Sequence, residues 1–124
     1  MPETTLIIDD DAIFNAVLVR TLERRGHVAH GATDPAAALT VAAKIRPARV
    51  VLDLNLNGSS GLALIPQLLA INPACRIVVL TGYASIATAV DAIKLGAVQY
   101  LAKPVEIEAI LGAFENDDEH DPAM

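Results

Sequence analysis

The sequence predicts an α/β fold in which one parallel sheet is covered by helices on both faces. Five short apolar runs rich in Val and Ile alternate with five helix-like segments along the chain. Right-handed connections between parallel strands place the intervening helices on the two faces of a single sheet. The length of 124 residues suits one domain built around one core.

The strands are expected where successive residues are apolar, because strands of a parallel sheet are buried on both faces. The clearest runs are residues 6–8, 50–52 and 77–80, which contain only Leu, Ile and Val. The five predicted strands comprise residues 5–8, 27–30, 49–52, 76–80 and 98–101.

Gly and Pro mark the helix boundaries. The second helix is the clearest, since Asp34 is a suitable N-cap, Pro35 suits the first helical position and Pro47 follows the end. In the third helix, Pro66 is expected to delay or kink the first turn. The other stop signals are Gly26, Asn72-Pro73 and Gly96, and the predicted apolar faces are Phe14, Val17, Leu18 and Leu22; Leu62, Ile65, Leu68 and Leu69; Ile86, Ala89, Val90 and Ile93; and Ile107, Ile110, Leu111 and Phe114.

Charge and composition exclude several classes of protein. The net charge is −6, and the five acids within residues 115–124 account for all but −1 of it. The body is therefore not basic enough for direct nucleic-acid binding, and residues 116–124 are expected to be a solvated acidic linker or tail. No apolar run reaches the ~18 residues of a membrane span, and no signal peptide is recognisable. With Cys75 as the single cysteine, a cytoplasmic location is expected.

Residues capable of chemistry gather where the predicted strands end. Three aspartates at positions 9–11 follow the first strand, Asp53 follows the third, Thr81 the fourth, and Lys103 lies just past the fifth. In open parallel sheets, the binding crevice lies beyond the carboxyl ends of the strands. The sequence therefore predicts that carboxylates, a hydroxyl and an ammonium share one rim.

This set of groups suits phosphoryl chemistry. Crowded carboxylates repel one another unless a cation neutralises them, and Mg²⁺ prefers such oxygen ligands. An aspartate at the site can act as a nucleophile toward phosphorus. A metal ion and the Lys103 ammonium would offset charge on the transferring phosphoryl oxygens, while the Thr81 hydroxyl would hydrogen-bond one of them.

The ordered pattern Asp9-Asp10, Asp53, Thr81-Gly82 and Lys103-Pro104 resembles the receiver domains of two-component response regulators. The resemblance extends over about residues 6–114 and implies a flavodoxin-like (βα)5 receiver fold, with a five-stranded sheet of order 2-1-3-4-5. It places the receiver domain at residues 1–115. It also implies a phosphoacceptor switch rather than an enzyme, with a sensor histidine kinase as partner.

The resemblance assigns the metal site and the phosphoacceptor. Asp53 would accept the phosphoryl group; Asp10 and Asp53 would bind Mg²⁺ directly, Asp9 would bind it through water, and Asn55 would contribute its backbone carbonyl. The loop after Asp53 departs from the common pattern, because many members have Pro where Asn57 stands.

The resemblance also assigns a switch. Lys103 would pair with the phosphoryl group, and Thr81 and Tyr100 would be the residues that change position. The peptide bond between Lys103 and Pro104 is expected to be cis. Phosphorylation is expected to produce a homodimer through the fourth helix, fifth strand and fifth helix.

Four segments, residues 9–11, 75–83, 86–90 and 100–104, resemble the RegA/PrrA/ActR branch of two-component transcriptional regulators. That branch couples the receiver to a small helix-turn-helix effector and often serves redox-responsive gene control. No basic helical segment follows Phe114, so the effector is expected to be absent from this chain.

Other functions remain open from the sequence. A stand-alone receiver that shuttles phosphate in a phosphorelay would carry the same residues. A phosphohydrolase would need a second acid near Asp53, where Asn55 stands, and a cap domain. A receiver that has lost phosphorylation would not need the complete set of acids, Thr81 and Lys103.

Several residues have simpler interpretations. Asp11 is expected to cap the first helix. Tyr83 is expected to be a partly exposed loop aromatic beside the site, and Cys75 a semi-buried thiol. His27 and His30 are expected to line an edge strand.

Overall fold

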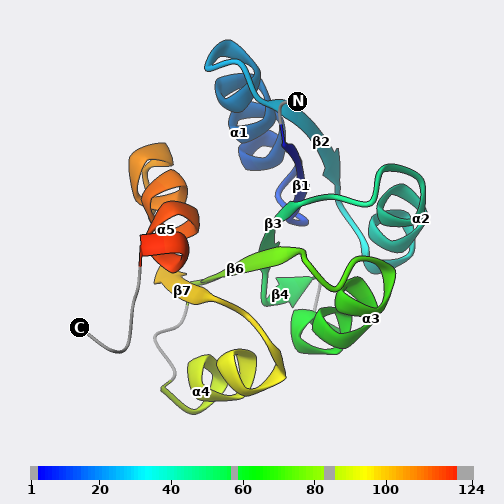
Figure 1. Cartoon of the computed structure of the whole chain (residues 1–124), viewed down its shortest axis with the longest axis vertical. Helices are drawn as coiled ribbons and strands as arrows, with labels where there is room; N and C mark the ends of the chain where they lie inside the picture. The colour runs from blue at the N-terminus through cyan, green and yellow to red at the C-terminus, as the bar shows by residue number, and fades with distance from the viewer. Residues whose placement is uncertain (1–2, 57–58, 83–85, 120–124) are drawn as a thin grey trace.

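Five strands form one parallel sheet in the order β2-β1-β3-β6-β7 (Figure 1). This is the predicted order 2-1-3-4-5, because β6 and β7 are the fourth and fifth strands of this sheet along the chain. The computed structural model of the chain describes residues 3–56, 59–82 and 86–119. Each strand lies within two residues of its predicted position; the strands are β1 (Thr4–Ile8), β2 (Val28–Ala32), β3 (Arg49–Asp53), β6 (Arg76–Thr81) and β7 (Gln99–Ala102).

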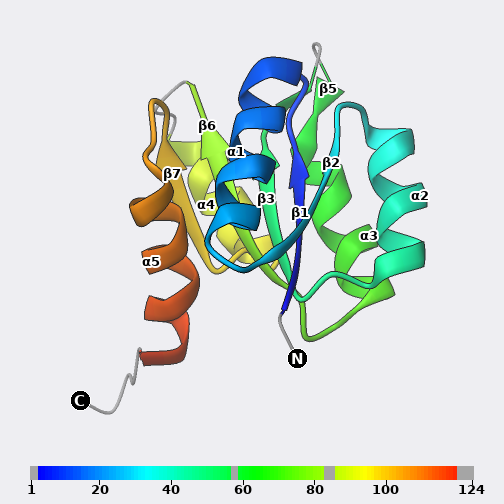
Figure 2. The same ribbon diagram turned by 90° about the horizontal axis from the view of Figure 1, so that it is seen from above.

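Helices cover both faces of the sheet (Figure 2). On one face lie α1 (Ala12–Arg24) and α5 (Ile107–Glu119), and on the other α2 (Pro35–Ile45), α3 (Leu64–Ile71) and α4 (Ile86–Leu95). A hydrophobic core lies on each face of the sheet, and alternate residues of the central strands point into one or the other. Leu6 and Ile8 pack toward α2 and α3, whereas Ile7 packs toward α1 and α5. All three side chains are fully buried, as expected for a central parallel strand.

Two aspartates cap helices as the sequence predicts. The Asp11 carboxylate accepts hydrogen bonds from the backbone N–H groups of Ile13 and Phe14, both at 3.1 Å. The Asp34 carboxylate accepts one from Ala37 N at 2.8 Å, and Pro35 occupies the first turn of α2. These bonds satisfy N–H groups that have no partner within the helix.

The predicted apolar faces of α1 and α4 are partly wrong. Val17 is 54% exposed, and Val90 and Ile93 are 44% and 43% exposed. The reason is that α1 packs on the sheet through a narrower stripe containing Leu18 and Leu22, whereas α4 packs through small alanines, leaving its larger residues outside. The side chain of Ile86 lies outside the described residues.

A short ribbon after β3 was not predicted. Strands β4 (Asn55–Leu56) and β5 (Ser59–Ser60) pair antiparallel, and the 3₁₀ helix η1 (Gly61–Ala63) precedes α3. Gly61 is required here because a Cβ at this position would lie 2.5 Å from the Asp53 carbonyl oxygen. The 3₁₀ turn ahead of α3 agrees with the expected effect of Pro66.

The Lys103–Pro104 bond is cis, as predicted. The predicted loop residues Asn57 and Tyr83, together with residues 120–124, lie outside the described residues. Within the described part of the chain, no helix combines the length and apolar character needed to cross a membrane.

Candidate functional site

The strand ends bring the predicted site residues to one rim. Asp53 is the last residue of β3 and pairs in register with Leu80, the neighbour of Thr81. Lys103 follows β7, and its N–H donates to the Thr81 carbonyl at 2.9 Å. On the other side, Asp9 N donates to the Ala32 carbonyl at 3.1 Å. Parallel pairing therefore fixes residues that are distant in sequence at the same edge.

Three carboxylates form the acidic cluster, defined here as Asp9, Asp10 and Asp53. One oxygen from each lies within 4.8 Å of the others. Asp9 and Asp53 are only 1% and 4% exposed, and Asp10 is partly buried. The cluster therefore concentrates up to three negative charges where water screens them weakly.

One ammonium group sits within the acidic cluster. Lys103 Nζ donates to Asp9 Oδ2 at 2.8 Å and to Asp53 Oδ2 at 3.4 Å. The second carboxylate oxygen of Asp9 and of Asp53 accepts a hydrogen bond from the backbone. Asp9 Oδ1 accepts from Asp11 N at 2.9 Å, and Asp53 Oδ1 accepts from Asn55 N at 3.1 Å. Lys103 thus contacts two of the three carboxylates of the acidic cluster.

The electrostatic environment alters two pKa values. Burial, opposed by the hydrogen bond from Asn55 N and reinforced by the charge of Asp9, raises the pKa of Asp53 above its ordinary value. Burial alone would lower the pKa of Lys103, but its hydrogen bonds and charge attraction to Asp9 and Asp53 outweigh that effect and raise it. Lys103 is therefore held as a cation, whereas the charge of Asp53 is unfavourable until another cation compensates it.

This imbalance predicts that Asp53→Asn stabilises the metal-free protein at neutral pH, by about 1 kcal/mol. Because the pKa of Asp53 is raised by folding, ionising it costs stability as the pH rises from its ordinary value of 3.8 through the raised value. The advantage of the variant should be absent below that ordinary value, grow as the pH rises to the raised pKa, and stay constant above it. Urea unfolding midpoints of both proteins at several pH values measure it, and an advantage independent of pH would contradict the argument.

The acidic cluster fits a hard divalent cation. All of its donor atoms are carboxylate oxygens, the ligand type that Mg²⁺ prefers, and one oxygen from each of three residues can reach a common point. Asn55 is held beside them through its hydrogen bond to Asp53, so its carbonyl remains a predicted fourth ligand.

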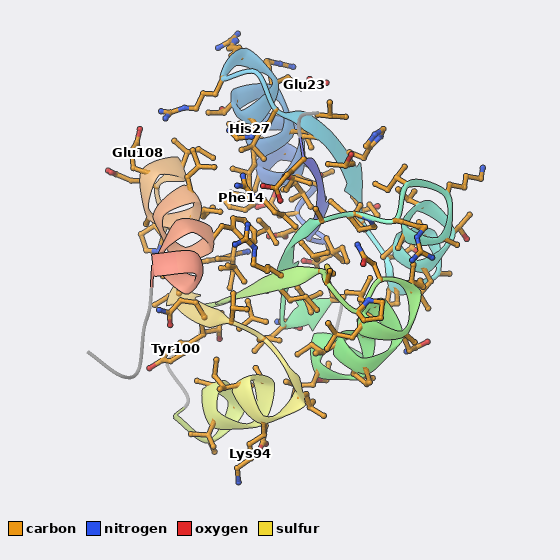
Figure 3. All side chains as sticks on the ribbon, in the orientation of Figure 1. Phe14, Glu23, His27, Lys94, Tyr100 and Glu108 are labelled. Carbon is orange, nitrogen blue, oxygen red and sulfur yellow. The ribbon has the colours of Figure 1, made fainter. Side chains whose placement is uncertain are left out.

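Phe14 belongs to the surroundings of Lys103, although the sequence predicted only a core role for it. Its ring lies between α1 and α5 (Figure 3), and Lys103 Nζ is 4.8 Å from the ring centroid. An aromatic face attracts an ammonium group. Phe14 therefore adds a third contact to the two carboxylates that hold Lys103.

The predicted switch residues occupy different environments. Thr81 is 9% exposed at the end of β6, whereas Tyr100 is 43% exposed and points outward beside α4 (Figure 3). Tyr100 lines a groove of about 220 Å³ with Ala89, Val90 and Ile93 of α4. The two residues lie on adjacent strands, since Thr81 pairs with Ala102, two residues past Tyr100.

Comparison with known proteins agrees with this geometry. Residues 5–115 match the response regulator receiver domain family. The photosynthetic apparatus regulatory protein RegA of Cereibacter sphaeroides is 43% identical over 109 residues, covering 88% of this chain and 59% of that protein. The acid tolerance regulatory protein ActR of Rhizobium meliloti is 42% identical over 112 residues, covering 90% of this chain and 58% of the length of ActR. The chain thus spans slightly more than half the length of these relatives.

A solved structure is similar as well. A response regulator protein from Burkholderia pseudomallei, crystallised with a phosphorylated aspartic acid, a calcium ion and citrate, superposes with a TM-score of 0.89. It is 47% identical in sequence, and the match covers 94% of this chain and 69% of that one.

Proposed function

Because the chain belongs to the response regulator receiver domain family, whose members are signalling switches, we propose that Asp53 accepts a phosphoryl group from a sensor histidine kinase. One observation carries the proposal: a buried carboxylate at the end of β3 lies beside two further aspartates and a lysine. The phosphorylated aspartic acid in the similar Burkholderia protein supports it.

The proposed transfer uses the residues of the acidic cluster together with Lys103. An oxygen of Asp53 attacks the phosphorus of the kinase phosphohistidine, and an O–P bond forms as the N–P bond breaks. The imidazole ring leaves as a neutral histidine because its other ring nitrogen already carries a proton, while the electron pair of the N–P bond stays on the leaving nitrogen. Asp10 and Asp53 would hold Mg²⁺ with the Asn55 carbonyl, and Asp9 would hold it through water. When bound, Mg²⁺ supplies positive charge that offsets the carboxylates and the phosphoryl oxygens. Lys103, now bonded to Asp9 and Asp53, turns to pair with a phosphoryl oxygen.

The switch follows from the new charge. A phosphoryl group adds nearly two negative charges and several hydrogen-bond acceptors. The Thr81 hydroxyl moves toward it, and Tyr100 turns inward from its exposed position into the space that Thr81 leaves. The phosphoryl group binds this arrangement more tightly, so phosphorylation shifts the population toward it.

The wider role follows from the relatives. The acidic residues 116–124, of which 116–119 belong to α5, are proposed to link the receiver domain at 1–115 to a DNA-binding effector that controls transcription in the cytoplasm. RegA and ActR, whose names describe regulatory proteins, are longer than this chain. The backbone of α5 continues to Glu119.

The central test is incubation of the chain with acetyl phosphate, read by intact mass. With Mg²⁺ present, we expect one added phosphoryl group per chain. After chelation with EDTA, we expect no addition, because the charge of the acidic cluster is then uncompensated. A mass that is unchanged in the presence of Mg²⁺ would overturn the proposed function.

The groove beside α4 is proposed to receive a second copy of the chain after phosphorylation. Exposed Val90, Ile93 and Tyr100 provide the apolar surface for such an interface. Val90→Glu is expected to block dimer formation, seen as loss of the phosphorylation-dependent shift in size-exclusion chromatography. The matched control is Val28→Glu, since Val28 is 41% exposed and lies on the opposite edge strand. Equal behaviour of the two variants would place the interface elsewhere.

A further inference from the structure

We infer that Asn15 is a positioning residue that fixes the turn carrying Asp9 and Asp10, and so sets the affinity of the acidic cluster for a divalent cation. The inference rests on the proposed function, because that function requires the cation. No role for Asn15 was predicted from the sequence, although Asn15 occupies the same buried face of α1 as Leu18 and Leu22.

The Asn15 side chain is a buried amide with three close acceptors. The residue is 4% exposed. Its Nδ2 lies 3.2 Å from the carbonyl oxygen of Ile7, 3.1 Å from that of Asp9 and 2.9 Å from that of Ala32. One side chain of α1 therefore joins the end of β1, the first residue of the acidic turn and the end of β2.

The bond to the Asp9 carbonyl is needed because the regular pairing of β1 with β2 stops at Ile8. β1 ends at Ile8 and α1 begins only at Ala12, so the intervening backbone lies outside both regular elements. Asp9 N still donates a hydrogen bond to the Ala32 carbonyl at 3.1 Å, but the Asp9 carbonyl lies past Ile8, the last residue of β1 that pairs with β2. A buried carbonyl requires a donor, and Asn15 provides it. The direction in which the chain leaves the sheet, and with it the position of Asp10, is thereby fixed.

A second observation, at Gly31 of β2, points to the same amide. A Cβ at Gly31 would lie 2.2 Å from Asn15 Oδ1 and 3.2 Å from Asn15 Cγ. The backbone of Gly31 is not in the left-handed region, so the glycine is needed for space rather than for conformation. Gly31 thus gives the Asn15 amide room to reach the three carbonyls.

The test separates positioning from simple packing by measuring Mg²⁺ affinity calorimetrically on folded protein. Asn15→Ala is expected to weaken Mg²⁺ binding by about tenfold or more, the usual effect of losing a partner that orients metal ligands. The phosphorylation rate with acetyl phosphate should return to the wild-type value at saturating Mg²⁺, because the reacting groups are intact. The control is Leu22→Ala, which removes packing from the same helix face and should lower stability without changing Mg²⁺ affinity.

Gly31→Ala provides an independent variant that keeps Asn15. It should also weaken Mg²⁺ binding, by displacing the amide, but it should have no further effect in the Asn15→Ala background, where the clash is gone. Unchanged Mg²⁺ affinity in folded Asn15→Ala, or additive effects of the two substitutions, would overturn the inference and leave the proposed function intact. A wild-type chain that binds no Mg²⁺ would overturn both.

Discussion

Asp53→Asn abolishes phosphorylation of the chain by acetyl phosphate: we expect no mass addition under conditions that modify the wild-type protein fully. The amide is nearly the same size and can still accept the hydrogen bond from Asn55 N that the carboxylate now accepts at 3.1 Å. It lacks the anionic oxygen that attacks phosphorus. Fold and packing are preserved while the nucleophile is removed, so intact mass spectrometry reports on the chemistry alone.

The matched control for that experiment is Asp34→Asn. Asp34 caps α2, away from the acidic cluster, and asparagine caps helices as well as aspartate does. This variant should be phosphorylated like the wild type. Full modification of Asp53→Asn would show that another residue accepts the phosphoryl group, and the site would have to be reassigned.

Lys103→Met is expected to slow phosphorylation by about a hundredfold to a thousandfold, the scale of losing one preorganised charged donor at a reacting group. Lys103 is the cation placed between Asp9 and Asp53, and methionine keeps much of the side-chain volume without the charge. Rates are measured by following intact mass with time at saturating Mg²⁺. Lys103→Arg should restore little activity, because the wider planar guanidinium does not fit the position of a compact ammonium.

Lys94→Met is the control for loss of a positive charge. Lys94 lies in the last turn of α4, beside the Tyr100 groove rather than at the rim. It should be phosphorylated at the wild-type rate. If Lys103→Met reacted as fast as this control, the role assigned to Lys103 would be wrong. The assignment of Asp53 as the nucleophile would be unaffected, because it is tested by Asp53→Asn.

The sequence alone determined the sheet and the rim. The runs of Leu, Ile and Val at positions 6–8, 50–52 and 77–80 are short and apolar on successive residues, a pattern typical of strands buried on both faces. Once the strands are known to be parallel, their carboxyl ends share one edge. The placement of Asp53, Thr81 and Lys103 on one edge then follows from the sequence, whereas the strand order that makes them neighbours was implied by the resemblance to receiver domains.

Helix faces were predicted less well, for a physical reason. A stripe of apolar residues at helical spacing identifies a half of the helix surface, but not which part of that half touches the sheet. Val17 and Val90 fall at the margin of their stripes and are exposed, because Leu18 on α1 and small alanines on α4 make the contacts. The rotation of a helix about its axis depends on the neighbours against which it packs.

Only the tertiary structure decided how the site is held. Lys103 pairs with Asp9 and Asp53, and the Phe14 ring lies beside its ammonium group. The Asn15 amide, which occupies the space beside Gly31, donates hydrogen bonds to Asp9 in the turn after β1 and to residues of β1 and β2. These contacts join residues from different elements at distances of a few ångströms, and a one-dimensional pattern of residue types carries no such distances. The sequence determined which groups lie at the rim, whereas packing of α1 against β1 and β2 determined where the Asp9–Asp10 turn is placed.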